Sequence, residues 1–346
     1  MKPVVLICLL FVSFGLKAQH KDLSKLFLKG KYEKVLEKGL LKLDQSPEDA
    51  VLNMIVGRSY VAINQYQTAI LYLEKAAEAD IEDVSVTAWS IAELGKAYYY
   101  TDQPDKAVVN FKRAIDMKAT RNCSRFARNC MMKYQMNDYF QKWNFRESEH
   151  LRFHFQDESV IKDIEQYIAK HEEAYQTINR FFKAELNKKI DLFVWKDREE
   201  AYNLLGRPIG FANSKRKMVN TWYKQTKGHE ICHILCDVAI QPMKKTKLIN
   251  EGICVYFDQT SRNKMDEARK VLPKDKFHLF ELWESPTQYE RDLSYPIGGA
   301  FIDFLINKEG KAKMMMFLED QTIENAEQVY PDFKNLVKVF EAMLHR

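Results

Sequence analysis

Glycine and proline are scarce in this sequence of 346 residues, which has 12 of the former and 9 of the latter. So few chain-breaking residues exclude long flexible linkers and fibrous repeats. The six cysteines form no CxxC pair, which argues against a disulfide-rich scaffold and against a cysteine-based zinc site. The hydrophobic fraction of 46% and the charged fraction of 29% are those of a folded protein, and the length predicts two domains.

The chain also lacks a strong excess of charge of either sign. Its 53 basic and 48 acidic residues give a net charge of +5, which does not indicate nucleic acid or an anionic membrane as a partner. After the N-terminus, no stretch approaches the roughly 18 uninterrupted apolar residues that a transmembrane helix needs. We therefore expect no nucleic-acid partner and no membrane insertion of the mature protein.

The N-terminal segment, residues 1–18, is typical of a secretory signal peptide. Lys2 precedes an apolar run that ends at Leu16, and the small residue Ala18 closes the segment. The alternative is a membrane anchor, but the apolar run is short for a bilayer core of about 30 Å. We expect an exported protein, periplasmic or secreted, from which this segment is cleaved. Cleavage would remove Cys8 and leave an odd number of cysteines.

Residues 20–146 contain a helical repeat, because segments 50–80 and 88–118 align residue by residue. The matched positions are small or aromatic residues where paired helices would touch: Gly57 with Gly95, Tyr60 with Tyr98, Ala69 with Ala107, Leu73 with Phe111, and Ala76 with Ala114. The pattern resembles the tetratricopeptide repeat, but the copies are further apart than that family's period of about 34 residues. We therefore expect a longer loop near residues 80–85. The resemblance implies either a surface for a peptide or protein partner or a packing module for the next domain.

A second domain, residues 147–346, is expected to follow a capping helical segment at 121–147. Period-2 alternation and apolar runs predict strands at 151–155, 190–195, 210–212 and 218–223. The last of these could be an edge strand that pairs with an extended peptide. Helical spacing predicts helices over 160–181, 198–205 with Asp197 as N-cap, 227–240, 247–259, 297–308, 312–318 and 333–344. Strands first and helices after predict an α+β domain, so the fold class is an all-α repeat followed by an α+β domain.

The segment His229–His233 carries the chemistry expected of the second domain. On a helix, the imidazoles of His229 and His233 lie one turn apart on the same face and can reach one metal ion. Glu230 lies beside them, where it can take a proton from a water molecule. Glu251, on the next predicted helix, can supply a third ligand and leave the fourth position open, as a catalytic zinc site requires. We therefore predict one Zn²⁺ per chain, held by His229, His233 and Glu251.

These residues resemble the motif of the thermolysin-like gluzincin metallopeptidases, in particular their peptidase MA-like branch. That family follows HExxH with Glu-Gly-x-Ala-x-Tyr, which residues 251–256 match except that Cys254 replaces the alanine. The resemblance covers about residues 147–320. It implies a thermolysin-like metallopeptidase domain that hydrolyses peptide bonds, with Glu230 acting first as general base and then as general acid.

The resemblance also implies a hydrogen-bond donor for the carbonyl oxygen of the substrate. Tyr295 is the first candidate, and Tyr256 and Tyr289 are alternatives. Carboxylates that orient the two imidazoles are expected as well. Asp237 and Asp258 are candidates for that role, or else they are solvated surface charges.

Two functions from different classes are compatible with these features. The first is an exported zinc peptidase, and it is expected to be an endopeptidase because residues 210–213 lack the Gly-x-Met-x-Asn spacing of the aminopeptidases in that family. The alternative is a non-catalytic module that binds a peptide or protein through the helical repeats and carries a silent peptidase fold. The presence of all four metal-site residues favours the peptidase, because a silent relative would be free to lose Glu230.

Overall fold

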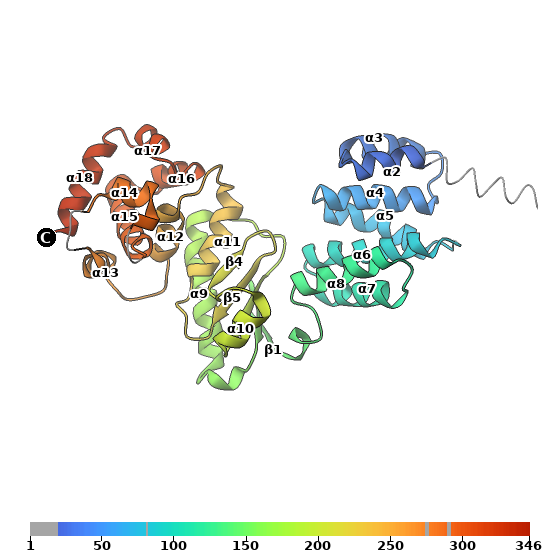
Figure 1. The fold of residues 1–346 in the computed structure, drawn as a ribbon, viewed down its shortest axis with the longest axis horizontal. Coiled ribbons are helices and arrows are strands. Elements are labelled where there is room, and N and C mark those ends of the chain that lie inside the picture. Colours follow the sequence, from blue (N-terminus) through green and yellow to red (C-terminus); the bar gives the residue numbers. More distant parts are fainter. Residues whose placement is uncertain (1–19, 81, 274–276, 289–291) are drawn as a thin grey trace, which may run out of the picture. The chain divides into compact units, whose positions relative to one another are not determined.

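The computed structural model describes residues 20–80, 82–273, 277–288 and 292–346, and Figure 1 shows the elements that they form. The chain divides into two compact units, residues 1–142 and 143–346, whereas the sequence placed this boundary after residue 146. The predicted signal peptide lies outside the described residues. Within those residues, no helix combines the length and the apolar character needed to cross a membrane.

The first unit is helical throughout its described part. Its α-helices are α2 (Lys21–Leu28), α3 (Tyr32–Leu43), α4 (Ala50–Ala62), α5 (Tyr66–Glu78), α6 (Val84–Tyr100), α7 (Pro104–Asp116) and α8 (Arg121–Lys133). Leu73 of α5 packs tightly against Gly57 of α4, and Phe111 of α7 packs in the same way against Gly95 of α6. The two helix pairs therefore make equivalent contacts, as the alignment of segments 50–80 and 88–118 requires.

Two details of the first unit differ from the prediction. Helix α6 has 17 residues, whereas the equivalent helix α4 of the first copy has 13. The residues that separate the two copies beyond the usual repeat period therefore lengthen a helix and not the loop near residues 80–85. Asp83 begins this longer helix by accepting a hydrogen bond from the backbone nitrogen of Ser85 at 3.0 Å. The helical segment predicted at 121–147 is too long, because α8 ends at Lys133 and residues 144–147 form a strand.

A row of side chains joins α2, α4, α6 and α8. Cζ of Arg58 lies between two rings, 4.7 Å from the centre of Phe27 and 4.2 Å from that of Trp89. Nε of Arg58 donates a hydrogen bond to Glu93 at 3.2 Å, and Trp89 contacts Phe126 with ring centres 5.5 Å apart. Because the charge of Arg58 is paired and rings of this unit flank its guanidinium group, the row contributes to packing within the unit.

The described residues of the second unit form one mixed sheet of five strands. They are β1 (Asn144–Glu147), β2 (Leu151–Phe155), β3 (Ile190–Trp195), β4 (Phe211–Asn213) and β5 (Met218–Trp222), in the order β1-β2-β3-β5-β4. The central strands β2, β3 and β5 are parallel, and β1 and β4 are antiparallel to their neighbours. The prediction of β5 as an edge strand is wrong, because β3 and β4 pair with it on its two sides. The edge beside the predicted site is β4.

Helices cover this sheet and extend the unit beyond it. They are α9 (Ile164–Phe182), α10 (Arg198–Leu205), α11 (His229–Ile240), α12 (Lys247–Tyr256), α13 (Lys264–Val271), α14 (Leu279–Glu284), α15 (Ser294–Glu309), α16 (Lys311–Glu319), α17 (Ile323–Val329) and α18 (Phe333–Leu344). Figure 1 shows α9 and α11 along the strands, with α12 to α18, orange to red, gathered to one side. One continuous apolar core joins strands β2, β3 and β5 to α9 and to helices α11 to α18. The described chain is thus mostly helical with one mixed sheet, which is compatible with helical repeats followed by an α+β region.

Candidate metal centre

Two consecutive helices bring the three predicted ligands together. Nε2 of His229 and Nε2 of His233 lie 3.2 and 3.3 Å from one oxygen atom, Oε2 of Glu251. The three ligand atoms lie within 4.8 Å of one another. A tetrahedral ion about 2.1 Å from each ligand requires ligand atoms roughly 3.4 Å apart. The distances to Glu251 therefore fit a zinc ion, and two imidazoles with one carboxylate are a donor set that zinc favours.

Local packing fixes how α11 and α12 meet. Helix α11 begins directly after Gly228, where a Cβ would lie 2.8 Å from the carbonyl oxygen of Phe257 at the end of α12. Deeper in the same contact, Cys232, Cys236 and Cys254 are buried and free. Burial raises the pKa of the Cys236 and Cys254 thiols, so they stay protonated and pack as small apolar side chains.

Glu251 and His233 stabilise each other's charged form. Burial opposes the ionised form of Glu251, but hydrogen bonds to His229 and His233 outweigh this effect and lower the pKa of Glu251. Burial also opposes the charged form of His233 and by itself would lower its pKa, but the Glu251 carboxylate outweighs burial and raises the pKa of His233. Glu251 is therefore ionised at neutral pH, and the centre attracts positive charge.

Glu230 lies beside the three ligands and is buried. Its Oε1 accepts a hydrogen bond from Nε2 of Gln225 at 3.1 Å, and Oε1 of Gln225 accepts one from the hydroxyl of Thr221 at 3.2 Å. Burial raises the pKa of Glu230, which makes its carboxylate a stronger base. Gln225 was not predicted from the sequence, where its only signal is a polar side chain in the turn between the last strand and the HExxH helix.

The structure separates the three tyrosine candidates. Tyr295 lines the same cleft as the ligands, and its ring lies nearly parallel to that of His229, with centres 5.8 Å apart. Burial and the Glu251 carboxylate raise the pKa of Tyr295, so its hydroxyl is a hydrogen-bond donor at neutral pH. Tyr256 is not among the residues that line the cleft, and its ring packs against Phe257. Tyr289 lies outside the described residues.

The two carboxylates considered as supports for the imidazoles have other partners. Asp237 accepts a hydrogen bond from Ser214 at 2.6 Å and pairs with Lys245, and Asp258 pairs with Lys264. In the described part of the chain, neither forms a hydrogen bond with the two histidines. The structure therefore does not support their predicted role in orienting the imidazoles. They are not solvated surface charges either, because each is partly buried and paired with a lysine.

Asn250 takes the place expected for such a support, since its Nδ2 lies 3.4 Å from Nδ1 of His233. A histidine that offers Nε2 to a metal carries its proton on Nδ1. Rotation of the Asn250 amide end would present Oδ1 to accept that proton. Asn250 was not predicted from the sequence, because asparagine has no fixed place in the motif, although it directly precedes the Glu251 ligand.

A cleft of about 860 Å³ opens onto the centre. Its walls come from helix α10 and the loop after it, strand β4, the end of β5 and the turn that follows, helices α11, α12 and α13, and the start of α15. The volume is within the range of natural ligand sites, roughly 300–1,000 Å³. The centre is therefore reachable from solvent by a substrate.

Comparison with known proteins does not indicate a function, so the proposal below depends on the site residues. No family model matches the chain, and no curated protein is significantly similar to it in sequence.

Proposed function

We propose that the second unit is an exported zinc endopeptidase of the gluzincin kind. The observation that carries this proposal is the convergence of His229, His233 and Glu251 at a solvent-accessible cleft with Glu230 beside them. A zinc ion bound there would act as a Lewis acid that makes an attacking water molecule more acidic. The first unit is proposed to be a tetratricopeptide-like module, and a protein or peptide partner on it stays a prediction.

The residues of the chain divide the remaining work among them. Glu230 accepts a proton from the attacking water and later passes it to the leaving amine. Gln225 holds the Glu230 carboxylate in place through its amide group. Tyr295 donates a hydrogen bond to the carbonyl oxygen as negative charge develops on it. Strand β4 offers an edge to which an extended peptide can add.

The first test measures metal and cleavage together. The purified protein is expected to bind one zinc per chain, to cleave members of a mixed peptide library, and to lose cleavage when a chelator removes the metal. Added zinc should restore cleavage, and His233→Ala should lower zinc affinity. One zinc per chain without any cleavage would overturn the peptidase and favour the binding module. Absence of zinc binding would overturn both the cofactor and the reaction.

The role of Tyr295 has its own test. Tyr295→Phe keeps the ring against His229 but removes the hydroxyl, so kcat is expected to fall by about 10²–10³ with a smaller change in KM. Tyr256→Phe is the matched control and should leave kcat near the wild-type value. An equal loss in both variants, or none in Tyr295→Phe, would contradict the assignment.

A further inference from the structure

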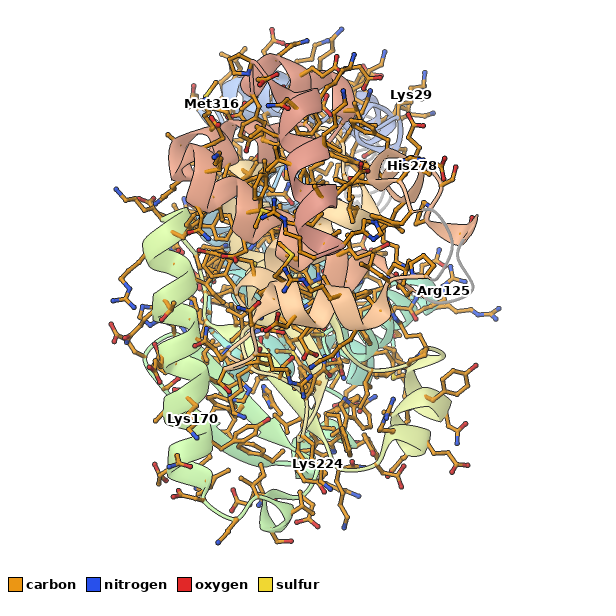
Figure 2. All side chains as sticks on the ribbon, turned by 90° about the vertical axis from the view of Figure 1, so that its left-hand side faces the viewer. Lys29, Arg125, Lys170, Lys224, His278 and Met316 are labelled. Atoms are coloured by element: carbon orange, nitrogen blue, oxygen red, sulfur yellow. The ribbon has the colours of Figure 1, made fainter. Side chains whose placement is uncertain are left out.

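One side of the cleft is strongly basic. Arg198 of α10, Arg207 from the loop after α10 and Lys224 from the turn after β5 all line the cleft that holds His229 and Glu251. We refer to Arg198, Arg207 and Lys224 as the basic wall. All three side chains are exposed and therefore accessible to a ligand in the cleft. Figure 2 labels Lys224 among the side chains of this unit.

The basic wall lies against the aromatic rings of Phe211, Trp222 and Tyr223, and Nζ of Lys224 is 5.2 Å from the centre of the Tyr223 ring. Cζ of Arg198 and Nζ of Lys224 each lie 5.4 Å from the centre of the Trp222 ring. Cζ of Arg207 lies 3.9 Å from the centre of the Phe211 ring. An aromatic face attracts a cation without neutralising its charge. The rings therefore favour positions of the three cations over the strands β4 and β5 and leave their charges available.

The other cations that line the cleft, as far as the structure describes its lining, are neutralised. Lys245 pairs with Asp237 and Lys264 pairs with Asp258. Arg262 pairs with Glu267 at 3.5 Å. In contrast, no member of the basic wall forms an ion pair with a described residue. Among the lining residues that the structure describes, the acidic ones that remain are Glu230 and Glu251, which belong to the metal centre. The excess positive charge is therefore confined to one side of the cleft.

This side is close to the reacting bond. Lys224 directly precedes Gln225, whose side chain donates a hydrogen bond to Glu230. Arg207 lies over Phe211, the first residue of the edge strand β4. A peptide that adds to β4 advances about 3.3 Å per residue, so the side chains next to the scissile bond would reach the basic wall.

We propose that the basic wall is a carboxylate subsite, which makes peptides with a carboxylate within one or two residues of the scissile bond the preferred substrates. This inference rests on the proposed peptidase function. The carboxylate can belong to an Asp or Glu side chain or to the C-terminus of the peptide. Arginine and lysine bind either group by the same charge-assisted hydrogen bonds.

The test uses peptides that differ only in charge. One set is acetylated and amidated at its ends and carries Glu, Gln or Lys at each position around a common cleavage site. The other set lacks the internal acid and ends in a free carboxylate or an amide. Cleavage by the zinc-loaded protein is read by mass spectrometry. The expected kcat/KM is about tenfold higher for Glu than for Gln, for the free carboxylate than for the amide, or for both, and the preference should shrink with salt.

Charge reversal identifies the residues responsible. The double variant Arg207→Glu, Lys224→Glu should remove or invert the preference. Lys170→Glu is the matched control, because Lys170 is an exposed lysine of α9 that does not line the cleft (Figure 2). It should keep the wild-type preference. Equal kcat/KM for the Glu, Gln and Lys peptides and for the two kinds of C-terminus, or a preference unchanged in the double variant, would overturn the subsite.

Binding separates this inference from the proposed function. Fluorescently labelled peptides of both sets are titrated into zinc-loaded Glu230→Gln, in which recognition is measured without cleavage. Tighter binding of the carboxylate peptides, lost in the triple variant that adds Arg207→Glu and Lys224→Glu, would support the subsite even if the wild type cleaves nothing. Cleavage without charge preference would overturn the subsite alone. Neither cleavage nor preferential binding would overturn both.

Discussion

Replacing Glu230 with glutamine is expected to abolish peptide cleavage while leaving zinc binding intact. The glutamine side chain keeps an oxygen that can accept the hydrogen bond from Gln225, so the local geometry is preserved. It cannot accept a proton from water at neutral pH. Loss of a positioned general base lowers kcat by about 10²–10⁴. The measurement is kcat on a peptide that the wild type cleaves, with the zinc content of both proteins determined in parallel.

Glu267→Gln is the matched control for this variant. Glu267 lines the same cleft, but its carboxylate pairs with Lys270 and Arg262 and is absent from the metal centre. Its replacement should leave kcat within about twofold of the wild type, since exposed ion pairs contribute little. If Glu230→Gln binds zinc and retains the full rate, another group is the base, and the proposed role of Glu230 fails.

Replacing Gly298 is expected to lower the free energy of unfolding of the second unit strongly, because the backbones of α12 and α15 are in contact there. A Cβ on Gly298 would lie 2.3 Å from the carbonyl oxygen of Leu248 and 3.0 Å from Cα of Gly252. Backbone atoms cannot rotate away, so the helices would have to separate. Overpacking of this kind lowers the free energy of unfolding by about 1–3 kcal/mol. Gly298→Val should lower it more than Gly298→Ala, because the valine side chain is larger.

The same change should reach the metal centre. Glu251 directly precedes Gly252, so a shift of α12 moves the third ligand relative to His229 and His233. Gly298→Ala is expected to lower both the free energy of unfolding in denaturant and the affinity for zinc. Asn307→Val, at an exposed position on α15, is the control and should cost well under 1 kcal/mol. Unchanged stability of Gly298→Val would show that the helices do not meet as described.

Segments with a strong internal pattern were predictable. Helix α10 at 198–205 and helix α18 at 333–344 have the predicted bounds, as do strands β2 and β3. Asp197 is confirmed as the N-cap of α10, because it accepts hydrogen bonds from the backbone nitrogens of Glu199 and Glu200. In these segments the apolar face and the cap are local properties, so neighbouring residues suffice to indicate them.

Short elements were missed because their stability comes from distant contacts. Helices α13, α14 and α17 have 8, 6 and 7 residues, and helices of this length do not persist without tertiary packing. Strand β1 exists through its pairing with β2. The role of β4 as the edge followed from the strand order, which no local pattern encodes. Gly252 of α12 faces Gly298 of α15, and no local pattern encodes this close approach.

The sequence by itself determined which groups can serve the proposed reaction. The spacing of His229 and His233 puts two imidazoles on one helix face whatever surrounds that helix. Tertiary structure alone decided that one oxygen of Glu251 meets both imidazoles and that Gln225 holds Glu230. It also decided that no acidic residue in the described ranges pairs with the basic wall. The physical reason is the separation along the chain over which each effect acts, because helical periodicity relates residues only a few positions apart. Contacts between α11, α12, α15 and the sheet depend instead on the packing of the whole second unit.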